Sequence, residues 1–186
     1  MAFQSILFYM IFRVLLATLL CTSFSVHHSN DEVLRWSPSR KLSWDDFSGL
    51  PPKTAANAAL TNSGIEMKFS TDGQSLSYEI SCNFDMRNSW GRVKNDHILS
   101  HEQGHFDIAE IHARKLNKAL KAYRITGNSV SKDLNGIYRQ IMDQLLLMQN
   151  QYDDETDYSR DFPEQKKWLG RIDIYLGDLR EYANYR

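Results

Sequence analysis

The residues best suited to chemistry are two histidines four positions apart. The run His101-Glu102-Gln103-Gly104-His105 matches the pattern H-E-x-x-H. On a helix, residues four apart lie one turn apart on the same face, so both imidazoles can reach one ion. Zinc favours neutral imidazole nitrogen, and Glu102 can take a proton from a zinc-bound water and pass it to a leaving amine. We therefore expect His101 and His105 to bind Zn²⁺ and Glu102 to be the general base of a peptidase.

The motif supplies two ligands, and the residues that follow it exclude one source of the third. One subclass of zinc peptidases with the H-E-x-x-H motif has Gly three residues after the second His and a third His three residues after that Gly. Here those positions hold Ile108 and Ile111. Glu110 lies five residues after His105, which points it away from the ion. The third ligand must therefore come from another part of the chain.

The motif lies inside a long amphipathic helix that starts near Val93 and ends at Gly127-Asn128. Apolar residues recur at steps of three and four along it: Leu99, Phe106, Ala109, Ala113, Leu116, Leu120 and Tyr123. A second helix, capped by Ser131, runs to Tyr152 and ends at an acidic break over residues 153–157, and a third opens near Pro163. Gly104 lies mid-helix at a cost of about 1 kcal/mol relative to Ala, which the close approach of substrate or of a neighbouring element would explain.

Upstream of the helices, the pattern is that of strands. Apolar and polar residues alternate over residues 65–69 and 76–84, and the Asp72-Gly73 pair between them predicts a hairpin. Residues 33–36 and 41–44 are shorter strand-like pieces. The predicted fold class is α+β: a small antiparallel β-sheet followed by three packed α-helices, with the H-E-x-x-H motif on the first long helix.

The chain is long enough for one domain and a leader. Residues 1–25 carry one charge, Arg13, within an apolar run, and a start at Met10 would give a cleaner export signal. We predict a signal peptide or an N-terminal membrane anchor over residues 1–25 and a single metallopeptidase domain over residues 26–186. The protein would then be exported, as a periplasmic, secreted or envelope-attached protein that contacts a membrane only through residues 1–25 if they are retained.

The charge and the cysteine content exclude several kinds of binding partner and a disulfide bond in the exported chain. The formal net charge is −1 over 186 residues, and −2 without the leader, which argues against nucleic acid or anionic membrane as a partner. Cys21 would be lost with the leader, so Cys82 would have no cysteine to pair with in the exported chain. The expected partner is a protein or peptide substrate.

Longer stretches resemble a bacterial family of secreted zinc-dependent proteases, the domain of unknown function 922. The resemblance covers residues 40–180 and rests on these runs: Leu42-Ser43-Trp44-Asp45-Asp46-Phe47, Ser89-Trp90, Leu99 to Glu110 with Ala113-Arg114-Lys115-Leu116, and Tyr152-Asp153-Asp154-Glu155-Thr156 with Gln165 and Trp168. The resemblance implies an exported zinc protease, and it implies no particular substrate.

One position departs from the family pattern. The family's stretch Asp-x-x-Thr-x-His supplies a histidine that would be the natural third ligand, whereas this chain has Tyr158 there, after Asp157. Three alternatives remain open. Direct ligation by Tyr158 or Asp157 ranks first by a small margin, and another carboxylate, such as Asp153 or Asp154, is a second alternative. In the third, the protein is a non-catalytic envelope module that retains the fold and binds metal weakly.

Overall fold

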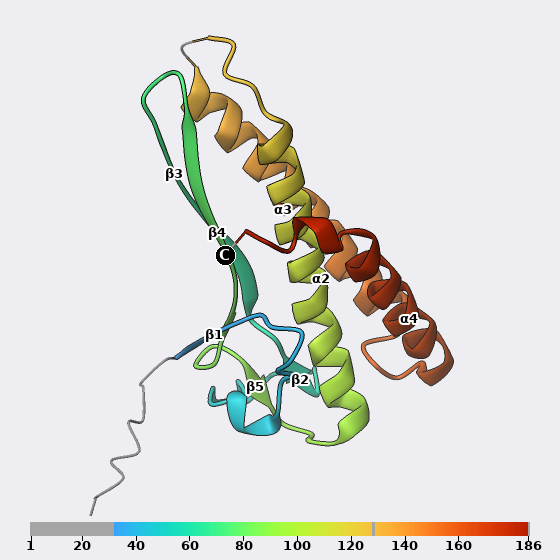
Figure 1. The fold of residues 1–186 in the computed structure, drawn as a ribbon. Coiled ribbons are helices and arrows are strands. Elements are labelled where there is room, and N and C mark those ends of the chain that lie inside the picture. Colours follow the sequence, from blue (N-terminus) through green and yellow to red (C-terminus); the bar gives the residue numbers. More distant parts are fainter. Residues whose placement is uncertain (1–31, 128, 186) are drawn as a thin grey trace, which may run out of the picture. The chain divides into compact units, whose positions relative to one another are not determined.

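The structure is a computed structural model that describes residues 32–127 and 129–185, so the predicted leader lies outside the described residues. The elements, shown in Figure 1, are β1 (Val33–Arg35), a 3₁₀ helix η1 (Trp44–Asp46), β2 (Ala59–Leu60), β3 (Ser63–Thr71), β4 (Leu76–Asp85), β5 (Trp90–Gly91), α2 (Asp96–Ala122), α3 (Val130–Glu155), α4 (Phe162–Asp178) and η2 (Arg180–Tyr182). In this part of the chain, no helix is long and apolar enough to cross a membrane.

The strands form two antiparallel sheets. The larger sheet has the order β1-β4-β3, and the predicted hairpin β3–β4 is confirmed, with Ile65 opposite Cys82 and Gly73 in the turn at φ 88°. The smaller sheet pairs β2 with β5 and was not predicted. The predicted strand piece at residues 41–44 is wrong. Asp46 Oδ2 accepts a hydrogen bond from the Ser43 backbone N–H (2.7 Å), which starts η1 there instead.

The three predicted helices are present, and their boundaries correct three expectations. Helix α2 ends at Ala122, before the predicted end at Gly127, and Tyr123 after it has an extended backbone. The side chain of Asn95 caps α2 by accepting from the Ile98 backbone N–H (2.9 Å). Helix α3 starts at Val130, one residue before the predicted cap at Ser131, and it continues to Glu155. The acidic run expected to break the chain is therefore partly the last turn of α3, and this places Asp153 on a helix.

Helix α2 is the central element of the fold. It contacts β3 and β4 of the larger sheet and also α3 and α4 (Figure 1). The core contains these fully buried residues, among others: Ile80, Phe84, Ile108, Ile111, Leu116, Leu134, Tyr152 and Ile172. The α+β class with the motif on the first long helix is confirmed.

The lengths of α2 and α3 decide which of their residues meet. The short connection between them makes the helices antiparallel neighbours. His101 lies 21 residues before the end of α2, and Asp153 lies 23 residues after the start of α3. At 1.5 Å per residue these are distances of about 32 and 35 Å from the connection. The beginning of α2, with the motif, therefore lies beside the end of α3.

Candidate metal centre

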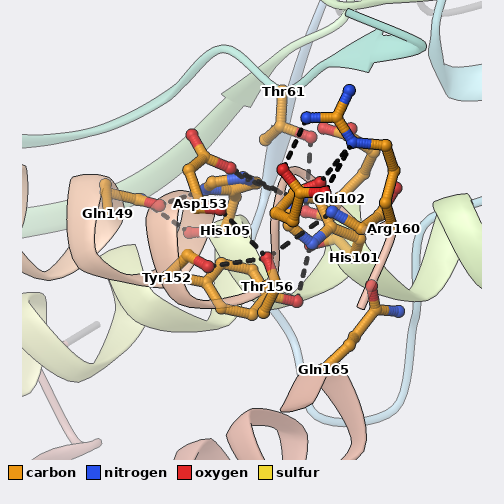
Figure 2. Close-up of polar contacts among 12 residues, drawn as sticks. Thr61, His101, Glu102, His105, Gln149, Tyr152, Asp153, Thr156, Arg160 and Gln165 are labelled. Carbon is orange, nitrogen blue, oxygen red and sulfur yellow. Dashed lines mark hydrogen bonds and ion pairs between the residues drawn. The ribbon is translucent and has the colours of Figure 1, made fainter. Parts of the chain in front are cut away.

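Three ligand atoms from two helices meet at one point. His101 Nε2 and His105 Nε2 lie 3.2 Å apart, and Asp153 Oδ1 lies 3.1 Å from the first and 3.0 Å from the second (Figure 2). Tetrahedral ligands that bind zinc at about 2.0–2.1 Å lie about 3.3–3.4 Å from one another. The three atoms are thus spaced close to one face of a zinc tetrahedron, and the fourth corner is left for a water or a substrate.

The third member of this group is Asp153, one of the two carboxylates named as alternatives to Tyr158 and Asp157. Of the two candidates ranked first, Asp157 is exposed and forms an ion pair with Arg160 (2.6 Å). Tyr158 lines the same cavity as the histidines, with 46% of its surface exposed. The geometry therefore favours an aspartate from the last turn of α3 over either residue of the following turn.

Neighbouring side chains hold both imidazoles, through hydrogen bonds at His105 and through ring stacking at His101. Gln149, one turn before Asp153 on α3, donates from Nε2 to the His105 carbonyl (2.9 Å) and accepts from His105 Nδ1 through Oε1. With its proton on Nδ1, His105 presents the lone pair of Nε2 to the point where the ligand atoms meet. His101 is 3% exposed and stacks on the ring of Tyr152, with ring centres 4.5 Å apart. Neither Gln149 nor Tyr152 was predicted to belong to the site.

The carboxylate of Asp153 and the two histidines shift one another's pKa values. Burial raises the pKa of the Asp153 carboxyl, but hydrogen bonds with both histidines outweigh burial and hold that pKa well below its ordinary value. Burial lowers the pKa of His101, which favours the neutral form that binds a metal. Burial also lowers the pKa of His105, but the hydrogen bond with Asp153 and the charges of Glu102 and Asp153 raise it above its ordinary value. A cation is therefore favoured here, as a proton on His105 or as a metal ion that displaces it.

Glu102 lies against the same cavity, which has a volume of about 230 Å³ and is also lined by β2. The side chain is 4% exposed, and its Oε2 is buried without a hydrogen-bond partner. A buried polar atom without a partner costs about 1–3 kcal/mol, and a water or a ligand in the adjoining cavity would remove this cost. Donor types, spacing and the unpartnered Glu102 oxygen all fit a divalent cation with one open position.

The glycine in the motif has a packing explanation. A Cβ at Gly104 would lie 2.5 Å from Tyr152 Oη and 2.8 Å from Tyr152 Cζ. Tyr152 is fully buried and donates from Oη to the His101 carbonyl (3.3 Å). The neighbouring element expected near Gly104 is therefore α3, and Gly104 lets Tyr152 lie under both histidines.

Comparison with known proteins assigns the chain to a family. The profile of a bacterial protein family of unknown function, DUF922, matches residues 52–160. The chain belongs to this family. The matched region runs from the segment before β2 to the turn after α3 and includes the three clustered ligands and Glu102. No curated protein and no solved structure matches the chain.

Proposed function

We propose that this DUF922 protein is an exported zinc-dependent peptidase. The observation that carries the proposal is the placement of Glu102 Oε2, buried and without a partner, against the cavity where His101, His105 and Asp153 bring their donor atoms within 3.2 Å of one another. Two histidines, one carboxylate and an open position are typical of a catalytic zinc site. The metal, when bound, supplies Lewis acidity that polarises a carbonyl and acidifies water.

The residues of the chain bind the ion, orient its ligands and transfer the proton. His101, His105 and Asp153 hold the ion, and Gln149 keeps the His105 ring in the required orientation. Glu102 takes a proton from the attacking water as the water oxygen bonds to the peptide carbon. Glu102 then gives that proton to the amide nitrogen as the C–N bond breaks. Burial of Glu102 keeps solvent from competing for this proton.

The test is the substitution Glu102→Gln in the purified protein. We expect the variant to bind zinc like the wild type and to lose cleavage of a peptide pool by at least about 100-fold, because general-base catalysis contributes about 10²–10⁴-fold. Glu66→Gln, an exposed change on β3, is the control and should retain full cleavage. Undiminished cleavage by Glu102→Gln would contradict the mechanism.

Two further outcomes identify other functions. A wild-type protein that binds zinc but cleaves no peptide would be the metal-binding envelope module considered from the sequence. Two histidines and one carboxylate are also the ligands of many non-haem iron sites. The metal content of the purified protein should therefore be measured for iron as well as for zinc. Export is tested by locating the protein, and retention in the cytoplasm would contradict that part of the proposal.

A further inference from the structure

A second cavity of about 590 Å³ lies beside the one that contains the candidate ligands. The two cavities share wall residues from three parts of the chain, namely Asn57, Ala58, Ile98, Tyr158 and Ser159. A peptide whose carbonyl lies at the candidate metal centre would therefore place a neighbouring side chain within reach of the second cavity.

The common wall includes a strained turn. Asp157, Tyr158 and Ser159 all have left-handed backbone conformations, with φ of 47°, 52° and 71°. Each costs about 1–2 kcal/mol in a residue with a side chain. The turn is held by a hydrogen bond from the Tyr158 N–H to the Asp153 carbonyl (2.8 Å) and by another between His97 Nε2 and the Ser159 carbonyl (2.6 Å). These hydrogen bonds keep the turn in place in spite of its energetic cost. The turn thereby positions Tyr158, which is half-exposed, between the two cavities.

Phe162 gives the second cavity an aromatic wall. The residue is 61% exposed, and its ring lies parallel to the imidazole of His97, with centres 3.6 Å apart. The start of α4 does not require an aromatic residue there, because Asp161 already caps the helix by accepting from the Glu164 N–H (2.9 Å). Helix capping therefore does not explain the phenylalanine at this position, most of whose surface stays exposed although it stacks on His97.

Arg160 and His97, the two basic side chains near this wall, have partners within the chain. Arg160 forms hydrogen bonds with both carboxylate oxygens of Asp157, at 2.6 and 3.0 Å. His97 uses Nε2 for the Ser159 carbonyl. The surface left for a ligand is then mainly apolar and aromatic, from Ile98, Tyr158 and Phe162. Such a surface favours an uncharged ring or a large aliphatic group over a charged one.

We propose that this second cavity is a specificity site for an aromatic or large aliphatic side chain of the peptide substrate, with Phe162 as the surface on which that side chain stacks. The inference rests on the proposed function for its choice of a peptide as the ligand. Aromatic stacking contributes about 0.5–1.5 kcal/mol, which corresponds to a preference of up to about tenfold.

The first experiment measures binding without turnover. The capped tripeptides Ala-Phe-Ala and Ala-Lys-Ala are titrated by NMR into Glu102→Gln protein, and then into the same protein carrying Phe162→Ala. We expect the phenylalanine peptide to bind about two- to tenfold more tightly, and this preference to disappear with Phe162→Ala. Ile174→Ala is the control, since Ile174 is also on α4, is equally exposed at 62% and does not line the cavity.

The second experiment digests a peptide pool with the wild type, Phe162→Ala and Ile174→Ala and identifies the products. A preference for large apolar residues beside the cleaved bond that only Phe162→Ala removes supports the inference. A preference that survives Phe162→Ala, or the absence of any difference between the two tripeptides, overturns it and leaves the proposed function standing. Binding that depends on Phe162, combined with no cleavage by the wild type, supports the cavity and contradicts the proposed function.

Discussion

The substitution Gly104→Ala tests how tightly α3 packs beneath the candidate metal centre. In an open helix, this change should stabilise the protein by about 1 kcal/mol, because alanine has the higher helix propensity. At Gly104, however, the new Cβ would lie 2.5–3.0 Å from three atoms of Tyr152. Ordinary contacts between carbon atoms are about 3.5–4.0 Å, so the Tyr152 ring must retreat by about 1 Å.

The Tyr152 ring has no free space to move into. It is fully buried, and its neighbours are His101 with ring centres at 4.5 Å, His105 at 5.0 Å and Trp168 at 5.4 Å. Overpacking of this kind costs about 1–3 kcal/mol, which exceeds the gain in helix propensity. We expect Gly104→Ala to be about 1 kcal/mol less stable than the wild type. Displacement of the two imidazoles should also weaken zinc binding by at least about tenfold.

Gly136→Ala is the matched control. Gly136 lies in the interior of α3, and a Cβ there would meet no atom within 4 Å. This variant should be about 1 kcal/mol more stable than the wild type, so the two alanine variants should differ by about 2 kcal/mol in urea unfolding. Tyr152→Phe removes the nearest atom, Oη, and should recover part of the loss in the double variant. Equal stability and equal zinc affinity of the two alanine variants would refute the packing described for Tyr152.

Two other predictions concern buried groups outside the site. Burial, assisted by the nearby Lys115 charge, lowers the pKa of His112 to about 4. The free energy of unfolding should therefore be independent of His112 protonation above pH 6.5. As the pH falls from 6.5 towards 4, it should decrease by an amount on the order of 3 kcal/mol, because the unfolded chain binds a proton at His112 that the folded protein does not. In metal-free protein, His112→Gln should reduce the dependence of the free energy of urea unfolding on pH between 6.5 and 4. An unchanged pH dependence would show that His112 is not its cause. Arg114→Met should cost about 3–5 kcal/mol, because it removes a charged partner (2.9 Å) of the fully buried Glu110. Arg35→Met, in an exposed ion pair, should cost less than about 1 kcal/mol, and equal losses in the two variants would contradict this reasoning.

The long elements could be predicted because each has a strong repeating pattern. The hairpin has alternation on both strands and a glycine at the turn, and α2 has apolar residues at every turn. Strands β2 and β5 have two residues each, which is too short for alternation to be visible. Their position depends on the pairing of Ala59 with Gly91 and Leu60 with Trp90, which nothing in the local sequence indicates.

The clustering of Asp153 with the two histidines could not be predicted from the sequence, because the acidic run looks unfavourable at the end of a helix. Carboxylates near a helix C-terminus are destabilised by the helix dipole and by one another. In the structure, hydrogen bonds with the two histidines offset this for Asp153, and Trp168 and Arg171 donate to Glu155 at 2.8 and 3.3 Å. These partners come from other helices. The nearly equal distances of His101 and Asp153 from the α2–α3 connection appear only with the observed helix ends, Ala122 and Val130. The ends predicted from the sequence, Gly127 and Ser131, do not give this match.

The central claim, that Asp153 completes a zinc site with His101 and His105, is tested most directly by zinc titration of Asp153→Asn. We predict about one zinc per wild-type chain and at least about 100-fold weaker binding in Asp153→Asn, since loss of a ligand should cost more than loss of a supporting group. Asp154→Asn, the same change at the exposed neighbouring position, and Tyr158→Phe should both bind zinc like the wild type. Undiminished affinity in Asp153→Asn, or loss of zinc in Tyr158→Phe, would contradict the claim.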